Sequence, residues 1–274
     1  MMQQRKQYKT AWMFTQRSHA DENFFEMMRQ GMENTPLFRN KQLFFQYVAL
    51  LYLGGMRRIE PFLKPITIQK IKDDEGNLFV KITHLNAKHF SGTRLRCICG
   101  SELGSIRKFK AHQVETGHSG YANMGTRKTL SSIFLLFGVH ERALVDYVLN
   151  GKQMATIDFT PLLPLSVQHT FVDNSPTDID KLESKLSGIT QKFKMFKMSI
   201  TDGATTKEGE SIVPHMLRHL RAFDLIANHG VSLPLAQRLL GWQSSDLAMR
   251  YADISSHISD TETFQLWKPV IKQS

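Results

Sequence analysis

A strand–turn–strand pattern in the first third of the chain most constrains the fold. Ile66–Ile71 and Leu78–Leu85 are rich in Ile, Val and Thr, and the turn-forming run Asp-Asp-Glu-Gly-Asn separates them. β-Branched residues favour strands and the acidic Gly-Asn run favours a tight reversal, so the pattern predicts an antiparallel hairpin. Thr126–Leu136 has the same character and predicts a third strand.

Helical patterns surround these strands. Before them we expect a helix over Asp21–Met32 and a strongly apolar helix over Asn40–Gly54, which a pair of glycines ends. Further helices are predicted over Glu141–Leu149, Lys181–Met198, Pro214–Asn228, Pro234–Leu240 and Ser245–Tyr251. The stretch Asp173–Asp180 is predicted to be a loop. The predicted fold class is α+β, mostly helical with a small antiparallel sheet.

The chain is strongly basic. It has 274 residues, with 35 Lys and Arg against 25 Asp and Glu, and 41% of its residues are hydrophobic, which is enough to bury a core. Excess positive charge predicts an anionic partner, with nucleic acid first and an anionic membrane second. Apolar runs such as Ile133–Val139 are far shorter than the roughly 18–20 residues that a spanning helix needs, and Met1–Thr10 is too polar for a signal peptide. We therefore expect double-stranded DNA as the partner and no membrane.

The positive charge is concentrated between Lys88 and Lys128. Eight basic residues stand there against two acidic ones, which accounts for six of the ten net charges. With two phenylalanines in the same segment, the pattern predicts contact with a phosphate backbone, and the alternative is a solvated loop. The predicted DNA-binding residues within it are Arg94, Arg96, Arg107, Lys108, Lys110 and Arg127.

The only two cysteines of the chain lie in this basic segment. Cys97 and Cys99 are followed by His112 and His118, which gives the spacing C-x-C, twelve residues, H-x5-H. It resembles a zinc finger with two Cys and two His, whose cysteines are usually two to four residues apart. We predict a structural zinc in a zinc-finger-like insertion over residues 89–125; the alternative is a basic loop without metal. Two cysteines cannot form a disulfide scaffold, which fits a reducing compartment.

Three polar side chains share one face of the helix predicted over Pro214–Asn228. His215, Arg218 and His219 stand at positions i, i+3 and i+4. Taken alone, the triplet is also compatible with a solvated helix face or with a zinc pair of histidines. A metalloprotease motif, however, needs Glu where Met216 stands.

Two further motifs accompany this helix. Gly55-Met56-Arg57-Arg58-Ile59-Glu60 follows the apolar helix, and Leu239-Leu240-Gly241-Trp242 precedes Met249-Arg250-Tyr251-Ala252. In this order, with His-x-Leu-Arg-His between them, the motifs resemble the catalytic domain of the tyrosine recombinase (phage integrase) family over roughly residues 40–255. The resemblance implies an N-terminal helical extension over residues 1–39 and a catalytic domain over residues 40–274 that contains the insertion.

The resemblance also implies a role for each motif residue. Tyr251 would attack DNA and store the energy of the broken bond in a 3′-phosphotyrosyl link. Arg57 and Arg218 would hold the charged phosphate oxygens. His215 would accept the tyrosine proton, and Trp242 would donate a hydrogen bond to a phosphate oxygen or simply be a core residue.

Supporting residues follow from the same resemblance. Lys88, at the end of the second strand, would be the general acid for the leaving 5′ oxygen, and Lys128 is the alternative. His219 would support the site by hydrogen bonding, and Glu60 would orient Arg57. The chemistry needs no metal or nucleotide, so structural zinc is the one cofactor predicted.

The function implied is a site-specific recombinase (integrase) that integrates or excises a mobile or viral element. It would work as a homotetramer on DNA in the cytoplasm or nucleoid of a prokaryotic or virus-infected host. With 56 residues before Arg57, we expect no full clamp domain of the kind this family usually carries. The alternatives are a non-catalytic DNA-binding relative and, less favoured, a nicking-closing enzyme like type IB topoisomerases. We favour the recombinase because every catalytic position holds a chemically competent residue.

Overall fold

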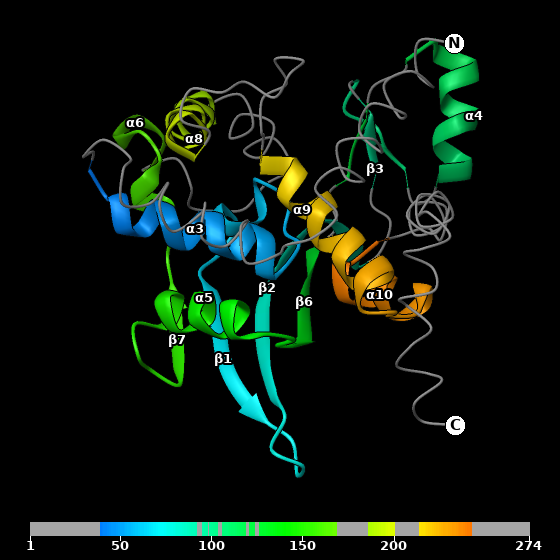
Figure 1. The fold of residues 1–274 in the computed structure, drawn as a ribbon. Helices are drawn as coiled ribbons and strands as arrows, with labels where there is room; N and C mark the ends of the chain where they lie inside the picture. The colour runs from blue at the N-terminus through cyan, green and yellow to red at the C-terminus, as the bar shows by residue number, and fades with distance from the viewer. Residues whose placement is uncertain are drawn as a thin grey trace.

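The computed structural model describes residues 39–91, 95–97, 99–103, 106–118, 121–123, 126–168, 186–200 and 214–242. In this part of the chain, helices pack on a four-stranded antiparallel sheet, and a smaller unit stands apart from them (Figure 1). The α+β class predicted from the sequence is confirmed. The helices predicted over Asp21–Met32 and Ser245–Tyr251, and the loop over Asp173–Asp180, lie outside the described residues.

The main sheet has the order β6-β2-β1-β7. Its strands are β1 (Ile66–Lys72), β2 (Leu78–Ser91), β6 (Thr126–Leu135) and β7 (Met154–Ile157). The predicted hairpin is β1–β2, and in its turn the Asp73 carboxylate accepts hydrogen bonds from the backbone N–H groups of Glu75 and Asn77, at 3.0 and 2.8 Å. β2 is longer than predicted because it keeps pairing with β6, past an irregularity between Leu85 and Phe90.

Helix α3 (Lys41–Leu53) lies in the middle of the core. From Phe44 to Leu53 every residue except Gln46 is buried, which explains the strongly apolar sequence. It packs against α5 (Val139–Leu149) and α9 (Pro214–Phe223). The remaining helices of the core are α6 (Leu165–Gln168), α8 (Ser187–Ile200) and α10 (Leu233–Leu240), with short 3-10 turns at Glu60–Phe62 and Thr160–Leu162. The predicted helix over Pro214–Asn228 is present, but its last turn, Asp224–Asn228, is a π-helix.

The segment between β2 and β6 forms its own sheet and helix, at the upper right of Figure 1. Its three strands, in the order β4-β3-β5, are β3 (Leu95–Cys97), β4 (Glu102–Leu103) and β5 (Tyr121–Asn123), and its helix is α4 (Ile106–Thr116). Leu95, Cys97 and Phe109 are buried within it. We call these elements the insert module.

A buried ion network joins α9 to its neighbours. Arg221 is fully buried and forms an ion pair with Glu141 of α5 and a second, at 3.3 Å, with Asp224. Tyr52 of α3 donates a hydrogen bond to the same Asp224 oxygen at 3.0 Å. The guanidinium also lies 5.3 Å from the ring centres of Tyr52 and Phe134. One cation therefore neutralises two carboxylates inside the core, close to the helix face that carries Arg218.

Among the described helices, none has the length and apolar character needed to cross a membrane.

Candidate active site

Arg218 brings the three sequence motifs together. Its Nη1 donates a hydrogen bond to the carbonyl oxygen of Gly55, and its Nη2 donates to the carbonyl oxygen of Leu240 at 2.6 Å. Gly55 opens the motif that contains Arg57, and Leu240 precedes Gly241 and the tryptophan. The Arg218 side chain is only 4% exposed, because the apolar residues around it on α9 face the core. The three motifs, which lie far apart in the sequence, therefore meet at the guanidinium of Arg218.

Two glycines permit this close approach. Gly55 and Gly241 both have left-handed backbone conformations, with φ of 53° and 60°. A Cβ atom at Gly55 would lie 2.3 Å from a methyl carbon of Leu240, and one at Gly241 would lie 2.4 Å from the amide nitrogen of Asn86. A side chain at either position would combine backbone strain with a steric clash. This explains why both motifs contain glycine at these points.

Glu60 holds Arg57 in place. Its carboxylate accepts hydrogen bonds from Arg57 Nη1 at 2.8 Å and from the Arg57 backbone N–H at 2.7 Å, and one from the Ala87 N–H at 3.1 Å. Burial alone would raise the pKa of this carboxyl, but electrostatic interactions with three neighbouring basic side chains bring it below its ordinary value. The neighbours are His84, Arg218 and Arg57. An ionised Glu60 thus fixes both Arg57 and the backbone of strand β2 at Ala87.

Asn86 is a member of the site that the motifs did not indicate. Its side chain is 1% exposed, and its Oδ1 accepts a hydrogen bond from Arg57 Nη1 at 3.3 Å. Its Nδ2 donates to the carbonyl oxygen of Gly241 at 3.4 Å. The only sequence signal for Asn86 was its position, directly after the strand predicted over Leu78–Leu85 and two residues before the predicted general acid Lys88.

The two lysines considered as general acid lie at the same level of the sheet. Lys88 belongs to β2, and Lys128 lies in β6 opposite the irregular stretch between Leu85 and Phe90. Lys128 is exposed. The backbone of β2 thus carries Lys88 to within two residues of the contact between Asn86 and Arg57.

The two histidines of α9 are in different environments. The ring centres of His215 and His219 lie 4.4 Å apart at an angle of 82°, and His215 is exposed. Burial, followed by the nearby His215 and Arg218, lowers the pKa of His219 to about 4. His219 is therefore neutral at neutral pH and suits hydrogen bonding, whereas His215 is accessible to a substrate.

Trp242 is 6% exposed and belongs to the main core. Its backbone N–H donates to the carbonyl oxygen of Gln237 at 2.9 Å, closing the end of α10. The core interpretation weighed for this residue therefore holds, and its contact with phosphate stays a prediction. Tyr251, the predicted nucleophile, and Arg94 lie outside the described residues.

The four predicted zinc ligands converge in the insert module. Cys97 Sγ lies 3.6 Å from His118 Nδ1, and Cys99 Sγ lies 3.3 Å from His112 Nε2. One ligand atom from each of the four residues lies within 4.8 Å of the others. Zinc bonds of about 2.0–2.3 Å in a tetrahedron place neighbouring ligands roughly 3.3–3.8 Å apart. The Cys97–His118 and Cys99–His112 distances lie in this range, and the four ligand atoms together lie within 4.8 Å.

The short cysteine spacing is accommodated by a tight turn. The Gly100 N–H donates to the Cys97 carbonyl at 2.9 Å, and Gly100 has a φ of 91°. Hydrogen bonds from the side chain and backbone of Ser101, with smaller ones from Cys97 and His112, lower the pKa of the Cys99 thiol to about 5. The thiolate form that a metal requires is therefore favoured at neutral pH.

The described members of the predicted DNA-binding set divide between the insert module and strand β6 of the main sheet. Arg107, Lys108 and Lys110 are exposed on α4. Arg96 is also exposed but forms an ion pair with Glu102 at 2.6 Å, and Arg127 of β6 is half-buried.

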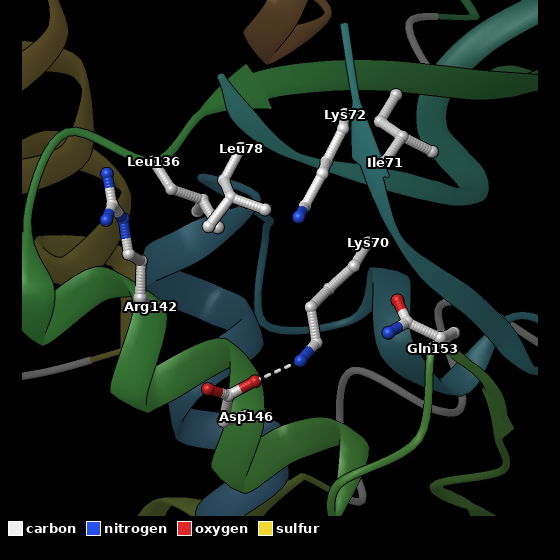
Figure 2. A pocket seen from close by; sticks show the side chains of 8 residues that line it. All are labelled: Lys70, Ile71, Lys72, Leu78, Leu136, Arg142, Asp146 and Gln153. Carbon is white, nitrogen blue, oxygen red and sulfur yellow. Dashed lines mark hydrogen bonds and ion pairs between the residues drawn. The ribbon is translucent and has the colours of Figure 1, made fainter. Parts of the chain in front are cut away.

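A separate hollow of about 490 Å³ lies where β1 ends and β2 begins (Figure 2). Lys70 forms an ion pair with Asp146 across it, as the dashed line shows. Its other lining residues are Ile71, Lys72, Leu78, Leu136, Arg142 and Gln153. It contains none of the predicted site residues.

Comparison with known proteins identifies the C-terminal part of this site. The sequence model of the phage integrase family matches residues 184–257, a range that includes the predicted residues of α9, Trp242 and Tyr251. The family predicted from the motifs is thus confirmed over that range. None of the curated proteins matches the sequence.

Among solved structures, the chain is similar to the XerH site-specific recombinase bound to its difH substrate in a pre-cleavage complex. The sequence identity is 14% and the TM-score 0.40, with 85% of this chain covered. The match spans 49% of the XerH chain, about half its length.

Proposed function

Because residues 184–257 match the sequence model of the phage integrase family, we propose that this protein is a site-specific DNA recombinase. The observation that carries the proposal is the pair of hydrogen bonds from Arg218, which draws the Arg57 motif and the Leu-Gly-Trp motif to the helix of the family match. Arg57 and Arg218 both interact electrostatically with Glu60, and two neighbouring guanidiniums suit the charged oxygens of a phosphodiester under attack.

The proposed reaction is a transfer of the DNA strand to tyrosine. The Tyr251 hydroxyl oxygen attacks phosphorus, the bond from phosphorus to the 5′ oxygen breaks, and a 3′-phosphotyrosyl link forms. His215 takes the tyrosine proton, and Lys88 or Lys128 gives a proton to the 5′ oxygen. Attack by a 5′ hydroxyl from another strand reverses these steps and joins the new partners. Arg57 stabilises the charge that builds on the phosphate.

The wider biological role is part of the same proposal. The protein would act as a homotetramer on double-stranded DNA and integrate or excise a mobile or viral element in a prokaryotic or virus-infected host. Residues 40–274 would form the catalytic domain, with the insert module within it and a helical extension before it.

The proposal is tested by trapping the covalent intermediate. Zinc-loaded protein is mixed with a pool of nicked duplexes of varied sequence, from which a short fragment is lost after cleavage so that rejoining fails. We expect a protein–DNA adduct that survives denaturing electrophoresis and forms with EDTA added only at the time of reaction. Binding without an adduct on any duplex would instead indicate a non-catalytic relative, and relaxation of plasmid without strand exchange would indicate a nicking-closing enzyme.

We further propose that Cys97, Cys99, His112 and His118 bind one structural zinc. The four ligand atoms already converge, and among the side chains of the module that the structure describes only Leu95, Cys97 and Phe109 are buried. A domain this small usually needs such a cross-link, because metal binding supplies folding free energy that its core cannot.

The zinc proposal predicts about one metal ion per chain by elemental analysis of dialysed protein. The double variant Cys97→Ser, His118→Ala should lose it, while cobalt in place of zinc should give the visible absorption of a tetrahedral thiolate complex in the parent protein only. Gln113→Ala is the matched control, because Gln113 follows His112 on α4 without being one of the four proposed ligands. Full zinc content in the double variant would contradict the assignment.

A further inference from the structure

The helix of the insert module has two contrasting faces. Inward, Phe109 is 5% exposed and His112 turns toward Cys99. Outward, Arg107, Lys110 and Val114 are all exposed, together with the small Ala111. These positions are i, i+3, i+7 and i+4, so they form one stripe along α4. We call this stripe the outer face of α4.

Val114 is the unusual member of this outer face. It is 88% exposed, the highest value among the exposed large hydrophobic residues of the described chain. Valine is also a poorer helix former than the straight-chain residues common on exposed helix surfaces. Neither packing nor helix propensity accounts for it, whereas contact with a partner would bury its methyl groups.

The chemistry of the stripe indicates duplex DNA as that partner. Arg107 and Lys110 of the stripe, with Lys108 beside it, outnumber the exposed Glu115, so this side of the helix is positive, which favours an anionic surface. A protein partner needs an apolar patch of several hundred Å², and one valine beside one alanine is far smaller. In the major groove, by contrast, single side chains suffice: Arg and Lys donate to guanine, and small apolar groups contact the thymine methyl.

The dimensions agree with this partner. The eleven residues of α4 make a helix roughly 16 Å long, and the major groove is about 12 Å wide. From Arg107 to Val114 the axial distance is about 10 Å, which corresponds to roughly three base-pair steps.

The connection to the main sheet also restricts where α4 can bind. β3 begins at Leu95, seven residues after Lys88, and seven extended residues span at most about 25 Å. The insert module is therefore held within reach of the same duplex that would be cleaved.

We propose that the outer face of α4 lies in the major groove beside the cleavage site and reads base sequence there. Arg107 and Lys110 contact phosphates and guanine edges, and Val114 contacts a thymine methyl group. This inference rests on the proposed function, since it assumes that the protein acts on duplex DNA. It gives the insert module a role in choosing the target site, separate from the chemistry at Arg57 and Arg218.

The test is selection of bound duplexes from a random-sequence pool by the zinc-loaded full chain. We expect the selected sequences to contain a block of about three to four base pairs that α4 specifies. Val114→Ala should lose the thymine preference at one position of that block, and Lys110→Ala should lose the base preference at another. Each variant should bind the duplex that the parent protein selects roughly 5- to 150-fold more weakly. Val139→Ala, at an exposed valine of α5 outside the module, is the matched control and should select the parent sequence.

A second arm removes the methyl group from the DNA instead. Uracil in place of the specified thymine should weaken binding by the parent protein but not by Val114→Ala. If α4 variants lose affinity equally on all sequences and select an unchanged block, α4 does not read bases and the inference is wrong. If the parent protein retains no duplex at all, the proposed function itself fails, so the two failures are distinguishable.

Discussion

Replacing Arg218 by lysine is expected to slow formation of the protein–DNA adduct by roughly 10²–10³-fold, the effect of losing one fixed donor to a charged transition state. Lysine keeps the charge but is a point donor, and it cannot hold the Gly55 and Leu240 carbonyls and a phosphate in one plane. Single-turnover cleavage of the nicked duplex measures the rate. Tyr251→Phe should abolish the adduct altogether, because it removes the attacking oxygen.

The matched control for Arg218→Lys is Arg238→Lys, at an exposed arginine of the neighbouring helix α10, which should react at the parent rate. Thermal unfolding and DNA affinity, measured on the same preparations, separate a loss of chemistry from a loss of fold. A folded Arg218→Lys protein that cleaves at the parent rate would rule out a role for Arg218 in holding the charged phosphate oxygens. An adduct that persists in Tyr251→Phe would show that another side chain is the nucleophile.

Replacing Arg221 by methionine is expected to lower the free energy of unfolding by about 3–5 kcal/mol. The change leaves the carboxylates of Glu141 and Asp224 inside the core without the cation that neutralises them. Unfolding by urea, followed by circular dichroism, measures the loss. Arg142→Met, at an exposed arginine of α5, should change stability by less than about 0.5 kcal/mol.

The origin of this effect can be isolated with a compensated variant. Arg221→Met combined with Glu141→Gln and Asp224→Asn removes the charge of all three groups, so most of the lost stability should return. An Arg221→Met protein as stable as the parent would show that the network contributes nothing. Failure of the triple variant to recover would assign the loss to packing against Tyr52 and Phe134 instead.

Elements with a strong repeating pattern were predictable from the sequence. The strands β1 and β6 and the helices α3, α5, α9 and α10 lie within a few residues of their predicted bounds, and β2 begins as predicted but runs on to Ser91. β7 and the strands of the insert module were missed, because four residues or fewer carry too little periodicity to stand out. Their strand structure comes from pairing with neighbours: β7 exists because Ile66–Gln69 lies beside it.

The candidate site was predictable as a set of residues but not as a geometry. Motif order indicated Arg57, Arg218 and Trp242, yet nothing in the sequence showed that Arg218 would bond to two backbone carbonyls. Asn86 was missed because a single amide carries no pattern. Arg221 was missed for a related reason: burial of an arginine depends on acids from two other positions, Glu141 and Asp224, that only the fold brings to it.

The pairing at the base of the insert module bears on how such a protein can change over evolutionary time. Ser91 and Thr126 are cross-strand partners, so the chain leaves the main sheet and returns to it at adjacent positions. Any segment inserted between Ser91 and Thr126 has to span only the distance between two paired strands. The entropic cost of closing such a loop rises only slowly with its length. Substitutions, insertions or exchange of the whole module can therefore accumulate without displacing β2 or β6. The proposed target preference and the proposed bond-breaking chemistry could in this way diverge at separate rates within one gene.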